Sequence, residues 1–271
     1  ITNWVIRFID EVNKTTAVNE NFDKVPIIDL NKNLVWFGTL AYCSLDTKLT
    51  LAEATMKLIT NEWEKLEKSA ASGDISAFGG SLLNPSNRLY YGTSSGLMYR
   101  LDNSDTSDSS VVIKNNMGAG GYISSISVDP YDGSKVMASF SNYNIKSIYY
   151  SENAGESWTD VSGNLEEFPN GQGSGPSVRS VYIYPLKFQY RYFAGTSTGL
   201  YSTDKLEGKD TKWIQEGSLT IGNIVVDMIA GRPADGYIAI ATHGNGMYSS
   251  NFESEILSID KPFTPNTFDL G

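Results

Sequence analysis

The chain has 271 residues but only one cysteine and one histidine, and this excludes several kinds of site. Cys43 has no second cysteine with which to form an intrachain disulfide. It lies in the strand-like AYCSL, which favours a small buried apolar side chain over a nucleophile. A Ser-His-Asp or Cys-His catalytic device would have to use His243. One histidine and one cysteine also exclude a conventional zinc site built from several such ligands.

Basic residues are few as well. The chain has 21 Lys and Arg against 31 Asp and Glu, which gives a formal net charge of −10. Phosphate groups are repelled by such a surface, so neither nucleic acid nor an anionic lipid is expected as a partner. No apolar run is long enough to span a bilayer. No secretory signal peptide is present, as expected of a processed secreted protein.

A short phrase with small residues at its centre recurs along the chain. It reads YYGTSSGLMY at 90–99, FAGTSTGLY at 193–201 and AIATHGNGMY at 239–248, with weaker copies WFGT at 36–39 and VMASFS at 136–141. The anchor residues are Gly38, Gly92, Ala138, Gly195 and Ala241, which by subtraction are 54, 46, 57 and 46 residues apart. A period of about 50 residues is typical of a repeat architecture rather than of one irregular core.

Residues 122–162 show what one repeat does. YISSISVD alternates apolar and polar side chains, as a half-buried strand does, and the turn DPYDGS follows it. KVMASFS is apolar throughout, which predicts a strand buried on both faces. KSIYYS and SWTDVS, joined by ENAGES, complete a four-stranded antiparallel meander. One such sheet cannot bury both faces, but several stacked around an axis can. The sequence therefore predicts an all-β fold, a β-propeller of four-stranded antiparallel blades.

We expect about five blades or part-blades within residues 25–252, as part of a larger propeller whose missing blades come from an upstream segment. The expected blades are 25–69, 74–115, 122–162, 177–217 and 224–252. The last unit supplies only three strands, so it needs a fourth from elsewhere. Residues 1–24 contain the candidate NWVIRFI at 3–9, either as this closing strand or as the end of a preceding blade. In the first unit, residues 51–66 could instead form an amphipathic helix.

Residues 151–158 read Ser-Glu-Asn-Ala-Gly-Glu-Ser-Trp and resemble the Asp-box, or BNR repeat, whose pattern is Ser-x-Asp-x-Gly-x-Ser/Thr-Trp. The matching residues are Ser151, Gly155, Ser157 and Trp158, and Asn153 replaces the usual Asp. The resemblance implies a hairpin between the last two strands of a blade. In it, polar side chains bond the turn backbone, Gly supplies a positive φ angle and Trp packs underneath.

A degraded second copy of the Asp-box begins at Ser202 and Asp204. It is stretched by LEGKD and ends at Thr211 and Trp213. Trp63 is the candidate for a third copy.

A wider resemblance covers about residues 25–250. They are similar to bacterial sortilin-like and xyloglucanase-like Asp-box propellers, whose blades carry phrases like SVDPYDG, ESWTDVSGNL and AIATHGNGMY in the same order. The resemblance implies a secreted family and a structural role for His243 in the last phrase. The Asp-box also occurs in sialidases, other glycosidases, sorting receptors and non-enzymatic surface proteins, so the fold does not give the function.

The tail, residues 253–271, contains Pro262 and Pro265, which break any helix. It resembles the extended linker that precedes the sorting domain of type IX secreted bacterial proteins, and TFDLG is similar to the opening of that domain. The Asn- and Pro-rich signature of the domain itself is absent. The resemblance implies export to the extracellular or outer-membrane surface of a bacterium.

The acidic residues are candidates for catalytic groups. A glycosidase needs two carboxylates that face each other across a cleft. Most acids here fall in turns, where Asp commonly bonds the backbone. Asp29, Asp74 and Asp227 instead lie at or within first, axis-facing strands, where they could line a central channel. No arginine cluster of the kind that sialidases use is evident.

Sixteen tyrosines and five tryptophans suit a carbohydrate-binding surface. Tyr192 and other tyrosines at repeat positions favour blade-to-blade packing, whereas the loop residues Tyr131 and Tyr143 are freer candidates for ligand binding. The loop NSDTSDSS at 103–110 could hold Ca²⁺ through its oxygens, although a solvated hairpin tip is the simpler interpretation. No other cofactor or metal is expected.

Two functions remain open. The leading hypothesis is a secreted or surface-anchored module that binds a protein or polysaccharide through its loops, without catalysis. The alternative is a sialidase- or xyloglucanase-like glycoside hydrolase whose catalytic site lies partly upstream; it predicts two inward-facing acids about 5–10 Å apart in an open cleft. A third interpretation, an assembly-factor propeller, is disfavoured by the acidic surface and the tail.

Overall fold

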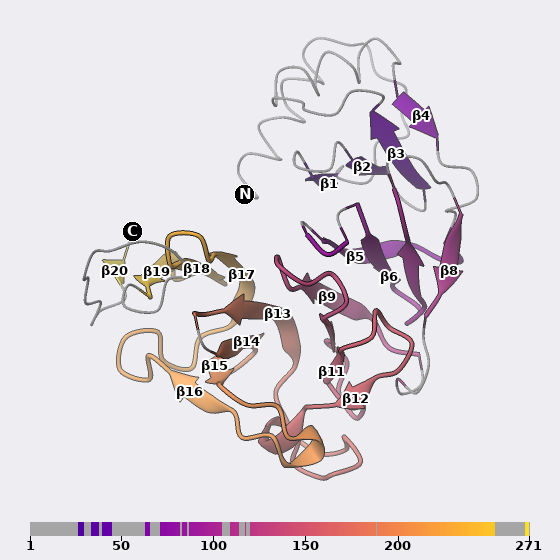
Figure 1. Ribbon diagram of the computed structural model, residues 1–271. Coiled ribbons are helices and arrows are strands. Elements are labelled where there is room, and N and C mark those ends of the chain that lie inside the picture. Colours follow the sequence, from indigo (N-terminus) through magenta and orange to yellow (C-terminus); the bar gives the residue numbers. More distant parts are fainter. Residues whose placement is uncertain are drawn as a thin grey trace.

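The computed structural model describes residues 71–252, except 82, 86, 105–108, 114–116, 118–119 and 188. It also describes the backbone of five outlying strands at 27–29, 34–37, 40–44, 63–65 and 269–270. The strands form five four-stranded antiparallel sheets, which Figure 1 shows following one another in chain order around a common axis. The predicted all-β fold of four-stranded blades is confirmed.

Each sheet is a simple meander. The first contains β1 (Ile27–Asp29), β2 (Leu34–Phe37), β3 (Leu40–Ser44) and β4 (Trp63–Lys65). The second contains β5 (Ile75–Gly80), β6 (Leu89–Thr93), β7 (Met98–Leu101) and β8 (Ser110–Val112). The third contains β9 (Ile123–Val128), β10 (Val136–Phe140), β11 (Ile148–Ser151) and β12 (Thr159–Asp160). The fourth contains β13 (Val178–Pro185), β14 (Tyr190–Thr196), β15 (Gly199–Thr203) and β16 (Ile214–Glu216). The fifth contains β17 (Val226–Arg232), β18 (Tyr237–Thr242), β19 (Met247–Asn251) and β20 (Asp269–Leu270).

Two three-residue 3-10 turns, η2 (Gly163–Leu165) and η3 (Gly208–Asp210), interrupt the strands. Within the described part of the chain, no helix has the length and apolar character needed to cross a membrane.

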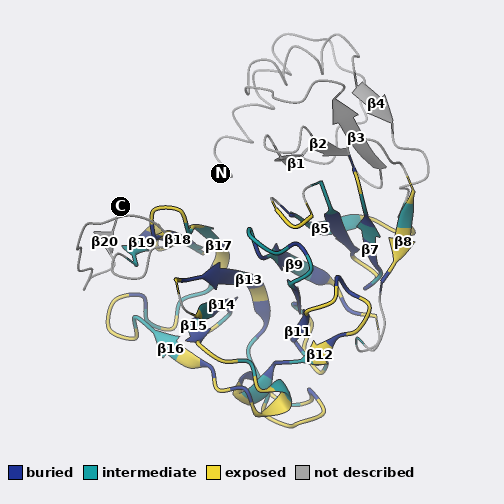
Figure 2. Cartoon of the chain, in the orientation of Figure 1, coloured by how far each residue is buried: buried dark blue, intermediate teal, exposed yellow. Residues whose placement is uncertain are grey.

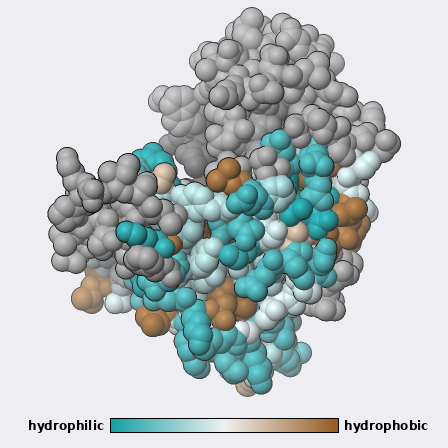
Figure 3. All heavy atoms as spheres, viewed as in Figure 1, coloured by the Kyte–Doolittle hydropathy of each residue, from teal (hydrophilic) through white to brown (hydrophobic). Residues whose placement is uncertain are grey.

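The hydrophobic core lies between neighbouring sheets. All five residues of β10 are buried, as predicted for a strand covered on both faces. Val136, Ala138 and Phe140 pack toward the second sheet, while Met137 packs toward the fourth. Figure 2 shows the buried residues concentrated along the strands, and the face drawn in Figure 3 is mostly hydrophilic where it is described. Successive sheets therefore stabilise one another, because each supplies a wall of its neighbour's core.

The small anchor residues allow the sheets to approach closely. A Cβ atom at Gly92 would lie 2.6 Å from Cγ2 of Ile123, and one at Gly195 would lie 2.8 Å from Cγ1 of Val226. In both cases the crowding side chain begins the innermost strand of the next sheet. Side-chain volume at these positions is therefore limited by the neighbouring sheet.

The structure corrects one anchor. Ala138 packs toward the preceding sheet, whereas Ser139 lies at the boundary with the following one. Its Oγ is 2.9 Å from Oγ of Ser124, which donates to the Val178 carbonyl (2.9 Å). The third repeat is thus displaced by one residue, and a one-residue displacement reverses the face of a strand.

Serines protect the free edges of the innermost strands β5, β9, β13 and β17, each of which contacts the next in this order. Oγ of Ser125 and Oγ of Ser127 in β9 accept hydrogen bonds from the backbone N–H groups of Val181 (3.2 Å) and Ile183 (2.9 Å) in β13. Ser180 of β13 accepts the N–H of Ile229 in β17 (3.1 Å). Donors that would otherwise stay unpaired at a strand edge are thereby satisfied.

The fourth strand of the fifth sheet comes from the tail. β20 pairs with β19, with Leu270 opposite Tyr248. The fourth-strand position considered for residues 3–9 is thus taken by β20, and the interpretation of 253–271 as a linker is corrected at 269–270; the alternative for residues 1–24, the end of a preceding blade, stays a prediction. The physical reason is that the open edge of β19 accepts any extended segment within reach. Residues 3–9 and 51–62 lie outside the described residues, as does the tail before β20.

Candidate binding site

The hairpin at residues 151–158 is held by its own polar groups. Oγ of Ser151 accepts the backbone N–H groups of Asn153 (3.3 Å) and Gly155 (2.9 Å), and it donates to Oδ1 of Asn153 (2.9 Å). The same Oδ1 accepts the N–H of Ser157 (2.9 Å), and Nδ2 of Asn153 donates to Oγ of Ser157 (2.8 Å). Gly155 has φ +84°, a conformation that glycine adopts readily. The turn is therefore closely fixed.

Two tryptophans link consecutive sheets. Nε1 of Trp158 donates to the carbonyl of Ile113, which follows the second sheet (2.9 Å), and Nε1 of Trp213 donates to that of Val161, which follows the third (2.9 Å). The second Asp-box-like segment thus has the same tryptophan contact as the first. Asp204, however, forms an ion pair with Arg191 (2.7 Å), whereas Asn153 bonds the backbone of its own turn.

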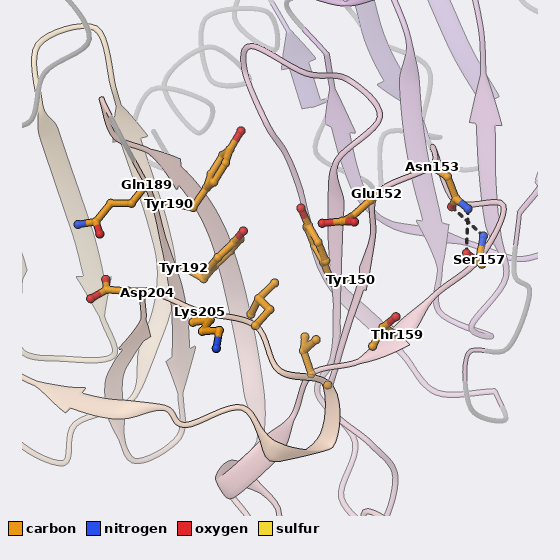
Figure 4. Close-up of a pocket in the computed structure, with 13 residues that line it drawn as sticks. Tyr150, Glu152, Asn153, Ser157, Thr159, Gln189, Tyr190, Tyr192, Asp204 and Lys205 are labelled. Atoms are coloured by element: carbon orange, nitrogen blue, oxygen red, sulfur yellow. Dashed lines mark hydrogen bonds between the residues drawn. The ribbon is translucent and has the colours of Figure 1, made fainter.

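A groove of about 510 Å³ lies between the third and fourth sheets. We call it the tyrosine groove, because Tyr150 of β11 and Tyr190 and Tyr192 of β14 line it. Figure 4 shows Tyr190 and Tyr192 on one side and Tyr150 with Glu152 on the other. The remaining lining residues include polar groups from both sheets: Asn153, Ser157, Thr159, Gln189, Asp204 and Lys205.

The tyrosine rings are held in fixed positions. Tyr190 and Tyr192 are two residues apart on β14, so they share a face, and their rings stack at 5.9 Å with an angle of 21°. Tyr150 meets Tyr192 edge to face at 5.8 Å. Nζ of Lys135 donates to the hydroxyl of Tyr190 (2.9 Å) and lies 4.7 Å from the centre of its ring. The rings are therefore held in place, and the half-buried Tyr190 offers most of the accessible aromatic surface, because Tyr150 and Tyr192 are only 6% and 7% exposed.

The groove presents uncharged phenols. Burial raises the pKa of Tyr192 to about 12, and burial also raises the pKa of Tyr150 above its ordinary value. Two charged residues nearby have partners of opposite sign: Lys205 pairs with Glu207, and Asp204 with Arg191. Aromatic faces beside hydroxyl, amide and carboxylate groups suit an uncharged polyhydroxylated ligand better than an anion.

A second pocket, of about 440 Å³, lies where the innermost strands begin. This inner-strand pocket is lined by Tyr122, Ser124, Ser141, Tyr143, Ser177, Arg179 and Asp227. It brings together two predicted site residues, Tyr143, which is 59% exposed, and Asp227. Oδ1 of Asp227 accepts from Nη1 of Arg179 (3.0 Å), and Oδ2 lies 3.3 Å from Nδ1 of His243. The structure thus gives Asp227 a guanidinium and an imidazole as neighbours.

The other predicted residues are dispersed. Asp74 is exposed just before β5 and lines neither pocket. Asp29 ends β1, and its side chain lies outside the described residues, as do those of Cys43 and Trp63. Tyr131 is half-buried in the turn where its N–H bonds Oδ1 of Asp129 (2.8 Å).

No metal-binding cluster of three or more His, Cys, Asp or Glu occurs among the residues that the structure describes. The Ca²⁺ interpretation of 103–110 falls largely outside them, and it stays a prediction.

Sequence reasoning missed the tyrosine groove. Tyr192 was expected only to pack between blades; it does so, and it also lines the groove. The one available signal was the alternation in YRYF at 190–193, which places Tyr190 and Tyr192 on the same face.

Comparison with known proteins supports the fold alone. No family model matches the sequence, and no curated protein matches it. Among solved structures, the β-propeller domain of Cps50 (Swd1) from Myceliophteria thermophila superposes with a TM-score of 0.57 at 9% identity. The match covers 88% of this chain and 67% of that one. The chain is therefore an all-β protein with the β-propeller fold.

Proposed function

We propose that this chain is a non-catalytic binding module that holds a polysaccharide in the tyrosine groove. The observation that carries the proposal is the half-buried ring of Tyr190, held in the groove by the buried rings of Tyr192 and Tyr150 from two sheets. Sugar rings have apolar C–H faces that pack on aromatic rings and hydroxyls that bond to the polar groups beside them.

The chemistry of the groove favours a neutral polysaccharide. The net charge of the protein is −10, so polymers with many carboxylates or sulfates are repelled. The same argument disfavours nucleic acid. A protein that binds to the loops is the other partner considered. The test below would favour it if no polysaccharide retarded the protein.

The cellular setting follows from the resemblances. The side-chain bonds of the 151–158 hairpin are those that the Asp-box resemblance implies, and they support placement among sortilin-like or xyloglucanase-like secreted propellers. The resemblance of the tail before β20 to the linker of type IX secreted proteins is the basis for proposing export by that route, although Asp269–Leu270 close the fifth sheet. We therefore propose that the module acts outside the cell or on the outer-membrane surface of a bacterium.

The test is affinity electrophoresis on neutral polysaccharides, including xyloglucan, with pectin as an acidic comparison. We expect a neutral polymer to retard the wild type, and Tyr190→Ala to weaken binding about tenfold, equivalent to about 1.4 kcal/mol. Tyr143→Ala, which removes an exposed ring outside the groove, is the matched control and should bind as the wild type does. Thermal unfolding of each variant checks that it is folded.

Three results would count against the proposal. Equal binding by Tyr190→Ala and wild type would show that the ligand does not bind in the tyrosine groove. Retardation by no polysaccharide would favour a protein ligand. Release of reducing ends, lost in Asp227→Asn, would instead establish the glycoside hydrolase.

A further inference from the structure

The fifth sheet buries only one of its faces among the described residues. Ile229, Ile238, Ile240 and Tyr248 pack against the fourth sheet. On the other face, Met228 pairs with Ala241, and Ala241 pairs with Met247. Met247 is 61% exposed and Met228 is 39% exposed. We call these three residues, with Ala230 and Ala239 in the next row, the outer face of the fifth sheet.

The equivalent positions in other sheets are buried. Met98 pairs with Gly92 and Leu200 pairs with Gly195, just as Met247 pairs with Ala241. Met98 and Leu200 are both 0% exposed. In those two sheets the anchor glycine lies against the first aliphatic residue of the next innermost strand, Ile123 or Val226. The outer face therefore repeats a pattern that elsewhere receives another sheet.

The five sheets form a series with two ends. Figure 1 shows the fifth sheet at one end of the series and the first sheet at the other. The solved propeller extends well beyond the region that this chain matches, since only 67% of its length is covered. Propellers commonly have about four to eight blades, so a series of five sheets allows a further one.

The polar groups indicate what the next innermost strand carries. The innermost strands β5, β9, β13 and β17 each have a register shift at one residue: Ser76, Ser124, Arg179 and Asp227, respectively. Ser76 donates to the Ile123 carbonyl (2.7 Å), Ser124 to the Val178 carbonyl (2.9 Å), and Arg179 to Asp227 (3.0 Å). Asp227 is the last of the series and accepts rather than donates. Its two carboxylate oxygens already have Arg179 and His243 as partners, but each can accept a further hydrogen bond, so a donor on a neighbouring strand would suit it.

We propose that the outer face of the fifth sheet docks a further four-stranded β-sheet from polypeptide beyond these 271 residues. Its innermost strand begins with a β-branched aliphatic residue that packs on Ala241. A donor side chain follows at the register shift and faces Asp227. This interaction surface is independent of the tyrosine groove and of its ligand.

Methionine oxidation tests the proposal, because covered thioethers react slowly with peroxide. The protein isolated from its source and the 271-residue chain are each treated with hydrogen peroxide and analysed by peptide mass spectrometry. In the source protein, Met228 and Met247 should oxidise as slowly as Met98 and Met137, which are 0% exposed and act as internal controls. In the 271-residue chain, Met247 should react as fast as it does in urea.

The other outcomes overturn the proposal. Fast oxidation of Met247 in the source protein would show an open face. Slow oxidation of Met247 in the isolated 271-residue chain would mean that segments of this chain cover the face. Protection that rises with protein concentration would identify a second copy.

A pair of variants gives an independent readout in the source protein. Met247→Glu should lower the melting temperature there, whereas Ile214→Glu, at a position that is 68% exposed on β16, should leave it unchanged. Equal melting temperatures for Met247→Glu and wild type would contradict docking.

Discussion

Gly92→Ala is the substitution that most sharply tests how the sheets pack. The new Cβ would lie 2.6 Å from Cγ2 of Ile123 and 2.9 Å from its Cβ and Cδ1. Carbon atoms in contact prefer about 3.5–4.0 Å, so the two sheets must separate by roughly 1 Å. Ile123 is fully buried, so its side chain cannot move aside into solvent. Overpacking of this kind costs about 1–3 kcal/mol of the free energy of unfolding.

The assay is thermal unfolding followed by circular dichroism. For a chain of this size about 1 kcal/mol lowers the melting temperature by roughly 2–4 °C, so Gly92→Ala should lose several degrees. Ile123→Ala removes the clashing Cγ2 and Cδ1 atoms at the expense of a cavity. Because Cβ of residue 123 remains, 2.9 Å from the new Cβ, part of the clash persists, and the double variant should lose clearly less stability than the sum of the two single losses. A wild-type melting temperature for Gly92→Ala, or additive losses in the double variant, would refute the account of sheet packing.

Three further predictions concern single groups. Burial raises the pKa of Glu166 above 4.5, against hydrogen bonds from Ser147 that lower it. Because the folded state holds this proton more tightly than the unfolded state, the stability that Glu166 contributes is greatest in acid and declines as pH rises through its folded pKa. Urea unfolding should then show Glu166→Gln matching the wild type below about pH 4 and exceeding it at pH 7, and identical pH profiles would contradict this. Asn153→Ala removes three hydrogen bonds of the hairpin and should cost about 1–2 kcal/mol in chemical denaturation, whereas Asn153→Asp keeps the accepting oxygen and should cost clearly less; equal losses would show that the side-chain bonds do not stabilise the turn. Burial raises the pKa of Tyr90, Tyr182 and Tyr192 to about 12 from 10.0, so stability should fall between these pH values as ionisation favours the unfolded chain; tyrosinate absorbance that reaches the value for all sixteen tyrosines before any loss of circular dichroism would argue against it.

The repeat and its strands were predictable from the sequence because they depend on local patterns. VMASF predicts a strand covered on both faces, and β10 is buried throughout. ENAGES predicts a tight turn, and Ala154 and Gly155 adopt positive φ angles there. Such features need only neighbouring residues, so one sequence is sufficient to find them.

Features that depend on the angle between sheets were not predictable. Tyr150 and Tyr190 are 40 residues apart in the sequence, and they line the same groove only because the third and fourth sheets pack face to face. Asp227 was correctly placed within an innermost strand, but its pairing with Arg179 depends on how β13 and β17 lie side by side. Ser139 was missed because VMASF contains two adjacent small residues, and only the partner strand shows which of them faces the next sheet.

The most direct test of the central claim measures binding and cleavage in the same sample. The protein is titrated with the neutral polysaccharide that retards it most, using calorimetry, and reducing ends are counted in the cell afterwards. The account predicts saturable binding by the wild type, binding about tenfold weaker by Tyr190→Ala, and no new reducing ends. New reducing ends, or equal affinity of the two proteins, would contradict it.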